Sequence, residues 1–248
     1  MPIDEPGSRD EPWSRAAPAR VVRELLVCGL FGAIIRTYSR VRIAGREHLE
    51  PLDGPVIFVA NHCSHVDTPA LLGSLPARWR RRTVVAAAAD YFYTNRALAC
   101  AVSLAFGTIP VERRRYGMAA DPTAPITHLL GSGWSVVIFA EGTRSRDGGL
   151  GPMRSGAAVL AAERGAPIIP VHISGTHEAM PVGSNWMVRP RDRGPWARHV
   201  ISVAFGPPIH VDPHDDRFEV MARARRFIDS GVASSTLDAT PRGDLIAT

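Results

Sequence analysis

Residues 55–67 read Pro55-Val56-Ile57-Phe58-Val59-Ala60-Asn61-His62-Cys63-Ser64-His65-Val66-Asp67. The first six are apolar and mostly β-branched or aromatic, with Gly54 before them and polar residues after, which predicts a short buried strand. Asp67 precedes Thr68 and Pro69, and an Asp N-cap with Pro in the first turn is typical of a helix start. The stretch therefore predicts a strand, a polar loop and a helix.

The polar loop carries a candidate catalytic pair. His62 lies at the predicted strand end and Asp67 at the helix start, and the four residues between them allow the chain to turn back. The carboxylate can then accept a hydrogen bond from one imidazole nitrogen, which leaves the other nitrogen free to take a proton. We therefore predict His62 as a general base that Asp67 orients.

Strand and helix patterns alternate along the rest of the chain. Strands are predicted at residues 41–43, 83–88, 108–111, 135–139, 167–171 and 200–205, and helices at 95–104, 121–131, 153–164 and 216–228. Pro110 cannot donate to a central ladder, so 108–111 is predicted at a sheet edge. The alternation predicts an α/β fold, a single domain with a central mixed, largely parallel sheet flanked by helices.

The predicted domain covers residues 18–230, between a disordered tail at 1–17 and a mobile tail at 231–248. It begins with an amphipathic helix at 18–40. The apolar run inside this helix, residues 25–35, is shorter than the roughly 20 residues that a membrane-spanning helix needs. Because Arg residues flank the run, it could lie in a membrane interface, or it could pack as an ordinary helix.

The charge of the chain is carried by 29 Arg, with no Lys, against 24 acidic residues, for a net charge of +5. A basic surface suits phosphate groups and anionic lipid, although a base-composition bias of the genome would also favour Arg. Arg78 and Arg80 to Arg82, around Trp79, are predicted to form a solvated loop or a face turned to anionic lipid. One such cluster gives little support to nucleic-acid binding, so no nucleic-acid partner is expected.

Three further blocks accompany Asn61-His62-x-Ser64-x-x-Asp67. They are Gly-Thr-Ile-Pro-Val-Glu-Arg at 107–113, Phe-Ala-Glu-Gly-Thr-Arg-Ser at 139–145 and Ile-Ile-Pro-Val at 168–171. Four blocks in this order resemble the glycerolipid acyltransferases, typified by lysophosphatidic acid acyltransferase, over roughly residues 55 to 175. Two positions depart from the family pattern: Ala140 stands where Pro is usual, and Arg154 where the basic residue is often Lys.

The resemblance implies a reaction and a set of partners. A fatty acyl group would pass from an acyl thioester, either acyl-CoA or acyl-acyl carrier protein as co-substrate, to the hydroxyl of lysophosphatidic acid or a related lysophospholipid in phospholipid synthesis. No other cofactor and no metal are expected. The enzyme would work at an anionic membrane surface, on the cytoplasmic face of the cell membrane, as a peripheral or monotopic protein.

The resemblance also assigns residues to the acceptor. Arg113 and the block of Glu141, Gly142, Thr143 and Arg144 would hold its glycerol phosphate, while Asn61 and Ser64 would shape the site. Guanidinium groups bind phosphate in bidentate fashion, and Gly lets backbone N–H groups approach closely. The segment 168–171 could line an acyl groove or form a core strand, and both interpretations stay open.

Other functions stay open as alternatives. Glycerol 3-phosphate or a non-glycerolipid alcohol could replace the lysophospholipid. His62, His65 and Asp67 could bind the metal of a hydrolase, and Cys63 could act as a thiol nucleophile. A non-catalytic peripheral protein that binds phospholipid would explain the Arg residues but not the His62–Asp67 pair. Cys28, Cys63 and Cys100 are widely spaced without a C-x-x-C pair, which indicates a reducing compartment.

Overall fold

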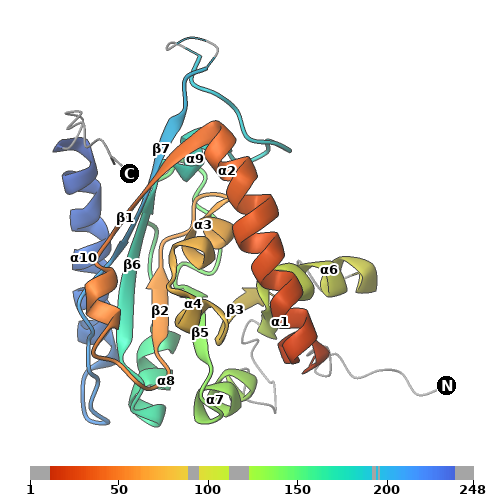
Figure 1. Cartoon of the computed structure of the whole chain (residues 1–248). Helices are drawn as coiled ribbons and strands as arrows, with labels where there is room; N and C mark the ends of the chain where they lie inside the picture. The colour runs from red at the N-terminus through yellow and green to blue at the C-terminus, as the bar shows by residue number, and fades with distance from the viewer. Residues whose placement is uncertain (1–11, 89–94, 112–122, 192–193, 195, 238–248) are drawn as a thin grey trace.

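The chain folds around a central β-sheet, shown in Figure 1 for the computed structural model. The structure describes residues 12–88, 95–111, 123–191, 194 and 196–237. Within these ranges the sheet has seven strands in the order β1-β7-β6-β2-β5-β3-β4. The strands are β1 Ser39–Ala44, β2 Ile57–Ala60, β3 Thr83–Ala88, β4 Thr108–Val111, β5 Ser135–Phe139, β6 Ile168–Ser174 and β7 His199–Phe205. Neighbouring strands are parallel except β6 and β7, so the predicted mixed, largely parallel sheet is confirmed.

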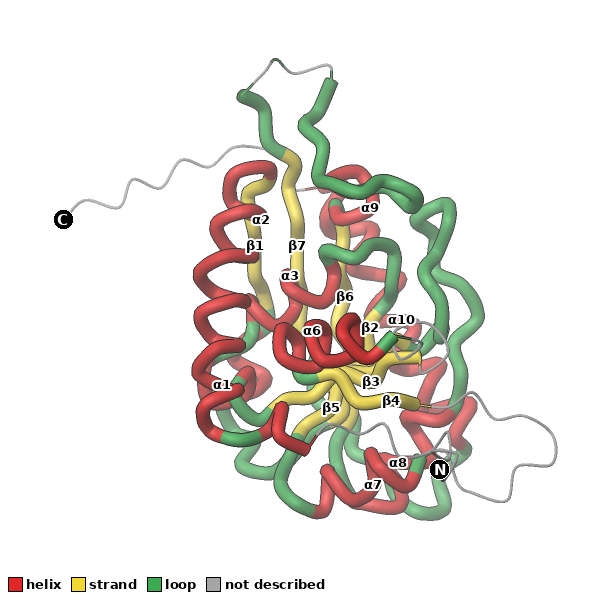
Figure 2. Tube along the Cα trace, turned by 90° about the vertical axis from the view of Figure 1, so that its right-hand side faces the viewer, coloured by secondary structure: helices red, strands yellow, loops and turns green. Residues whose placement is uncertain are grey.

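Helices cover both faces of this sheet (Figures 1 and 2). They are α1 Ala17–Glu24, α2 Gly32–Tyr38, α3 Asp67–Ser74, α4 Ala77–Arg80, α6 Arg96–Phe106, α7 Ala124–Gly131, α8 Gly156–Arg164, α9 Thr176–Ala179 and α10 Arg217–Leu237, with the short helices η1 Pro12–Arg15 and η3 Arg46–Leu49. A π-helical turn, η2 Leu25–Phe31, joins α1 to α2. No helix within the described ranges is both long enough and apolar enough to cross a bilayer.

The side chains of strand β2 contribute to two hydrophobic clusters, one on each face of the sheet. Ile57 and Val59 pack into the cluster that includes α7, α8 and α10, whereas Phe58 and Ala60 pack into the cluster with α3 and the N-terminal helices. Successive side chains of a strand point to opposite faces, so a strand covered on both faces must be apolar throughout. This is why residues 55–60 read as one continuous apolar run.

The predicted tails differ from the structure in two places. Residues 12–15, expected in the disordered tail, form η1 with Ser14 buried, and residues 1–11 lie outside the described part. Helix α10 continues past the expected stop at 228 to Leu237, into the segment predicted as a mobile tail. The edge position of β4 is as Pro110 predicts.

The basic cluster near Trp79 has a structural role that the sequence did not predict. Arg80 pairs with Glu24 of α1 at 2.7 Å and donates to the Leu75 carbonyl after α3, also at 2.7 Å. Arg78 donates to the Leu49 carbonyl at the end of η3, at 2.6 Å. Arginine side chains can donate in this way to the last carbonyls of a helix, which lack a partner within the helix itself. Arg78 and Arg80 therefore join helices to one another, and Arg81 also pairs with Glu24, at 3.7 Å.

The N-terminal helices are fixed by a buried cation. Arg23 donates to the carbonyls of Ser103 and Leu104 at the end of α6, at 2.8 and 3.1 Å, and to that of Ser14 at 2.7 Å. Burial, together with the charges of Arg20 and Arg15, lowers the pKa of Arg23 to about 10, which leaves it charged at neutral pH. The cation complements the negative end of the α6 dipole. Helix α1 is therefore attached to α6.

Replacing Phe58 with Ala is expected to lower the free energy of unfolding by about 3–5 kcal/mol, because it leaves a cavity at a fully buried position. The ring also makes edge contacts with Trp79 and Phe205, with centroids 6.2 Å away in each case. Urea unfolding followed by circular dichroism measures the change. Phe218→Ala, on a ring that is 63% exposed, is the matched control and should stay within about 0.5 kcal/mol of the parent. Equal losses in the two variants would contradict the described core.

Candidate active site

The loop between β2 and α3 is built on the buried carboxylate of Asp67. One oxygen, Oδ2, accepts hydrogen bonds from His62 Nδ1 at 2.8 Å, from the Cys63 backbone N at 2.6 Å and from the Ser64 backbone N at 2.8 Å. Asp67 is the first residue of α3, and Val66 occupies the N-cap position that the sequence predicted for Asp67. The Asp67 carboxylate turns back to the loop. An ionised carboxylate only accepts, so Nδ1 carries the proton and Nε2 remains an acceptor.

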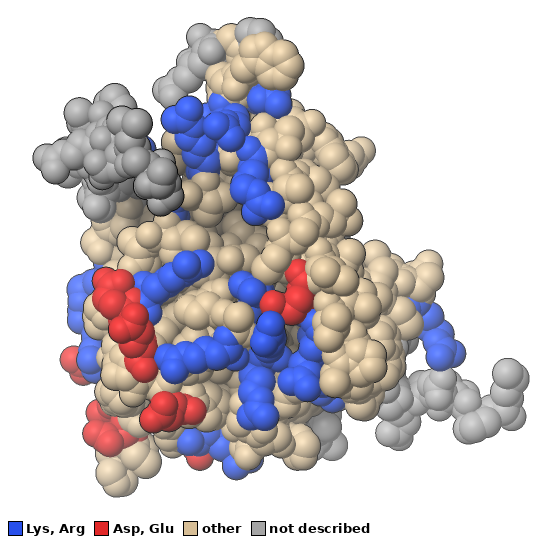
Figure 3. Space-filling view, in the orientation of Figure 1, with Lys and Arg blue, Asp and Glu red and all other residues tan. Residues whose placement is uncertain are grey.

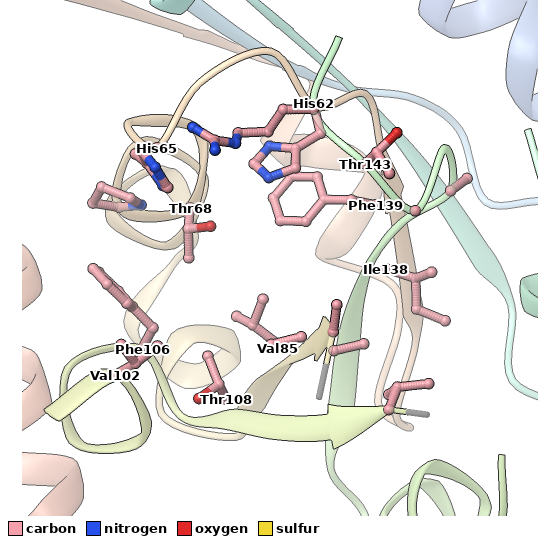
Figure 4. A pocket seen from close by; sticks show the side chains of 18 of the residues that line it. His62, His65, Thr68, Val85, Val102, Phe106, Thr108, Ile138, Phe139 and Thr143 are labelled. Carbon is pink, nitrogen blue, oxygen red and sulfur yellow. The ribbon is translucent and has the colours of Figure 1, made fainter. Parts of the chain in front are cut away.

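Three further contacts hold His62, one through its ring and two through its backbone. Its ring stacks on Phe139 of β5, with centroids 4.0 Å apart and an interplanar angle of 20°. Its backbone N donates to Glu141 Oε1 at 3.0 Å, and its carbonyl accepts from the Ser145 N at 2.7 Å. The side chain keeps 19% of its surface accessible and lines a large pocket (Figure 4). The imidazole is therefore fixed in place and open to a ligand.

Asn61 and Ser64 attach the same loop to the neighbouring elements. Asn61 exchanges two hydrogen bonds with the backbone of Ile173 in β6, at 2.7 and 2.8 Å. Ser64 Oγ donates to the Met180 carbonyl at 2.8 Å. Both side chains are buried, and their contacts hold the loop that carries His62, while a role in shaping the site stays a prediction.

The block from Glu141 to Arg144 divides into two parts. Gly142, Thr143 and Arg144 line the pocket, and Gly142 has a φ of +72° that favours glycine. Glu141 instead accepts hydrogen bonds from two backbone N–H groups. Its Oε1 accepts from His62, as described above, and its Oε2 accepts from Gly151 at 2.8 Å. Its carboxylate therefore connects the loop that follows β5 to the backbone of His62, a role the sequence did not predict. Arg113, the other predicted phosphate ligand, lies outside the described residues.

The pocket has a volume of about 1460 Å³ and two chemically different regions. The polar region contains His62, Arg144 and Arg154, together with the N-terminus of α8 at Gly156. A Cβ at Gly142 would lie 2.9 Å from Arg154 Nε, so the Arg154 side chain lies over this glycine. In the view of Figure 3, Arg side chains gather over the middle of the molecule. The polar region therefore suits an anion beside the imidazole.

The apolar region of the pocket lies below His62 in Figure 4, between β3, β5 and α6. Val85, Val102, Phe106 and Ile138 line it, with Phe31 of the N-terminal helices. Sequence reasoning missed these residues because a groove wall and a core helix give the same apolar spacing. Residues 168–171, one candidate for the groove, are buried in β6, and Ile168, Ile169 and Val171 belong to the two core clusters, so the core-strand interpretation is confirmed.

Two alternative chemistries find little support at this site. In the described part of the chain, no group of three or more His, Cys, Asp or Glu side chains is arranged to hold a metal ion. Burial, followed by the charge of Asp67, raises the pKa of Cys63 to about 12, so its thiol stays protonated. Burial and the charge of Arg144 lower the pKa of His65, which lines the pocket and is neutral at pH 7.

Comparison with known proteins places this geometry in a family context. The model of the acyltransferase family matches residues 40–174. A chloroplastic 1-acyl-sn-glycerol-3-phosphate acyltransferase of Brassica napus is 32% identical over 158 residues, which cover 64% of this chain and 44% of that protein. The Homo sapiens 1-acyl-sn-glycerol-3-phosphate acyltransferase alpha is 32% identical over 137 residues, or 54% of this chain and 46% of that protein. The chain thus spans about half the length of these relatives.

The fold also resembles a solved structure. The 1-acyl-sn-glycerophosphate (LPA) acyltransferase PlsC of Thermotoga maritima superimposes with a TM-score of 0.68 at 21% identity, over 95% of this chain and 86% of that chain. At this identity the likeness concerns the fold. Together with the match to the family model, it confirms the resemblance that the four sequence blocks suggested.

The raised pKa of Cys63 predicts slow alkylation. At about pH 8 the thiolate fraction at a pKa of about 12 is roughly 1000-fold lower than at the ordinary 9.0, so reaction with iodoacetamide should slow by about 10²–10³-fold. Timed alkylation of the folded protein and mass spectrometry of its peptides measure the rate. Cys28 and Cys100, both partly buried, are internal comparisons. Alkylation of Cys63 at the rate of a free thiol would contradict the described site.

Proposed function

The chain belongs to the acyltransferase family, and we propose that it transfers a fatty acyl group from an acyl thioester to the hydroxyl of lysophosphatidic acid or a related lysophospholipid. The observation that carries this proposal is the His62–Asp67 pair, which opens onto a pocket with one polar region, lined by arginines, and one apolar region. The relatives named above are 1-acyl-sn-glycerol-3-phosphate acyltransferases, which supports the same substrate class. The product would be a diacylated phospholipid.

In the proposed mechanism His62 Nε2 accepts the proton of the acceptor hydroxyl as its oxygen attacks the thioester carbonyl. The new ester C–O bond forms, the C–S bond breaks, and the proton passes from the imidazolium to the departing thiolate. Asp67 stabilises the imidazolium through the bond to Nδ1. The mechanism needs no covalent intermediate, in agreement with the protonated state of Cys63.

The phosphate of the acceptor would occupy the polar region of the pocket. Arg144 and Arg154 line it, and the first turn of α8 adds the positive end of a helix dipole at Gly156. Thr143 is a further hydrogen-bond donor on the same wall. Arg113 remains a predicted ligand of the phosphate. A phosphate held here lies in the same pocket as the general base.

The apolar region would hold fatty acyl chains. Each buried methylene contributes about 0.8 kcal/mol, so a wall formed by Val85, Val102, Phe106 and Ile138 favours a long chain. An acceptor with its own acyl chain uses this wall better than glycerol 3-phosphate does, and we therefore place lysophospholipids first. Acyl-CoA and acyl-acyl carrier protein are both proposed donors. A protein that only bound phospholipid would leave the ordered imidazole without a role.

We place the enzyme at the cytoplasmic face of the cell membrane, attached as a peripheral or monotopic protein to anionic lipid. Val21 and Leu25, one turn apart on the N-terminal helices, are 60% and 68% exposed, and Leu30 is 53% exposed. An apolar helix face of this kind is typical of interfacial attachment. The opposite side of the same helices packs on the domain through Val27 and Ile35.

Replacing His62 with Ala is expected to lower turnover by about 10²–10⁴-fold, since the general base is lost. Purified protein is incubated with long-chain acyl-CoA or acyl-acyl carrier protein and lysophosphatidic acid, while thiol release and lipid product are followed. His128→Ala, an exposed histidine on α7, is the matched control and should keep full turnover. Thiol release that persists unchanged in the His62 variant would overturn the mechanism. A wild-type protein inactive with both donors, on lysophosphatidic acid and on related lysophospholipids, would overturn the proposed reaction.

Replacing Glu141 with Gln separates a positioning role from phosphate binding. The amide keeps one acceptor oxygen but turns an NH₂ group toward one of the two backbone donors. The loop should shift, and kcat should fall by about 10–100-fold with the KM for the acceptor nearly unchanged. Steady-state kinetics measure both constants, with Glu219→Gln on the exposed face of α10 as control. A rise in acceptor KM at constant kcat would instead assign Glu141 to the phosphate.

A further inference from the structure

The segment between α9 and β7 carries exposed tryptophans. We name residues 181–198 the Trp–Arg arm; its described residues are 181–191, 194 and 196–198. Trp196 is 84% exposed and Trp186 57%, and Val182 and Val188 are 38% and 39% exposed. The described parts of the arm project beyond α9 and the start of β7 (Figures 1 and 2). The arm thus presents large apolar side chains outside the core.

Contacts with the rest of the domain hold this arm in place. Met187 is buried in the main core cluster, and the Val188 N donates to the Ala179 carbonyl at 2.8 Å. Trp186 Nε1 donates to the Tyr38 hydroxyl at 3.1 Å. The Arg189 guanidinium lies over the rings of Tyr38 and Trp196, at 5.2 and 5.8 Å from their centroids. Trp186 and Met187 are therefore held by defined contacts, and Arg189 connects this part of the arm to the exposed Trp196.

The charge of the arm is positive. Its sequence contains Arg189, Arg191, Arg193 and Arg198 against one acidic residue, Asp192. Arg191 and Arg198 are exposed, and Arg198 donates to the Arg36 carbonyl of α2 at 3.1 Å. Tryptophan beside Arg is the combination found where proteins meet the headgroup region of an anionic bilayer. The composition therefore complements anionic lipid in both its apolar and its charged parts.

The arm also adjoins the pocket. Val182, Trp186 and Met187 line the same pocket as His62, and so do Phe31 and Ile34 of the N-terminal helices. The arm contacts α2 through Tyr38 and Arg36. A lipid bound between the arm and the N-terminal helices would therefore reach the pocket directly. An acidic protein would complement the arginines but would leave the exposed tryptophans and valines without an apolar partner.

We propose that the Trp–Arg arm is a membrane-contact surface separate from the N-terminal helices, and that its partner is a bilayer containing anionic phospholipid. Trp196 enters the interface while Arg191 and Arg198 bind lipid phosphates. Delivery of a lipid acceptor to His62 rests on the proposed function, whereas membrane contact does not. Binding can therefore be measured without turnover.

The test is flotation of the 248-residue chain with vesicles of phosphatidylcholine, with or without phosphatidylglycerol. Trp196→Ser should lower the partition coefficient about tenfold on both kinds of vesicle. The double variant Arg191→Gln/Arg198→Gln should lower it by about 10–30-fold on vesicles with phosphatidylglycerol only, and should flatten its salt dependence. Phe218→Ser and Arg223→Gln, exposed positions on α10, are the matched controls and should bind as the parent does.

Two results would overturn the proposal. The first is parental binding by both arm variants, with circular dichroism showing them folded. The second is parental vesicle binding combined with slower turnover on acyl-acyl carrier protein but not on acyl-CoA, which would assign the arm to an acidic carrier protein. Loss of vesicle binding in a protein that is inactive with every donor would still support the arm while refuting the proposed function.

Discussion

The architecture of the site depends on one buried oxygen atom, Oδ2 of Asp67. A carboxylate that is fully buried is stable as an anion only when hydrogen bonds replace its lost hydration. Here the backbone N–H groups of Cys63 and Ser64 supply two of these bonds, and they fold the loop back over the start of α3. The third bond comes from His62 and selects its tautomer. Loop shape and imidazole chemistry therefore have the same physical cause.

A second carboxylate repeats this arrangement after β5. Glu141 connects the His62 backbone to Gly151, and Arg225 of α10 donates to the Gly151 and Leu150 carbonyls at 2.8 and 3.2 Å. The acidic residue of a block predicted to bind phosphate thereby fixes a loop, and it is not among the residues that line the pocket. The cations of Arg144 and Arg154 line the pocket instead.

The sequence predicted those parts of the fold that local chemistry determines. The apolar run of β2, the edge proline of β4 and the end of the predicted helix at 164, where Gly165 follows α8 with a φ of +62°, each depend on residues close in the chain. The destinations of the arginines could not be predicted, because a charge in the sequence does not say which helix end it will face. Arg46, for example, donates to the Ser74 carbonyl at the end of α3, 28 positions away. The apolar region of the pocket could not be predicted for a related reason. In the sequence Phe106 has the pattern of a core residue, and only the folded arrangement of helices and strands shows that it lines a pocket.

The same tertiary contacts connect the exposed apolar helix to the groove. Arg23 attaches α1 to the last carbonyls of α6, and Phe31 packs against Phe106 with ring centroids 5.1 Å apart. Both aromatic residues line the pocket, while Leu25 and Leu30 on the same N-terminal helices face outward. One helical element thus has an outer apolar face and an inner face that forms part of the groove. If the outer face lies in a bilayer, an acyl chain can pass from the bilayer into the apolar region of the pocket without crossing water. Crossing water would cost free energy that grows with every methylene exposed.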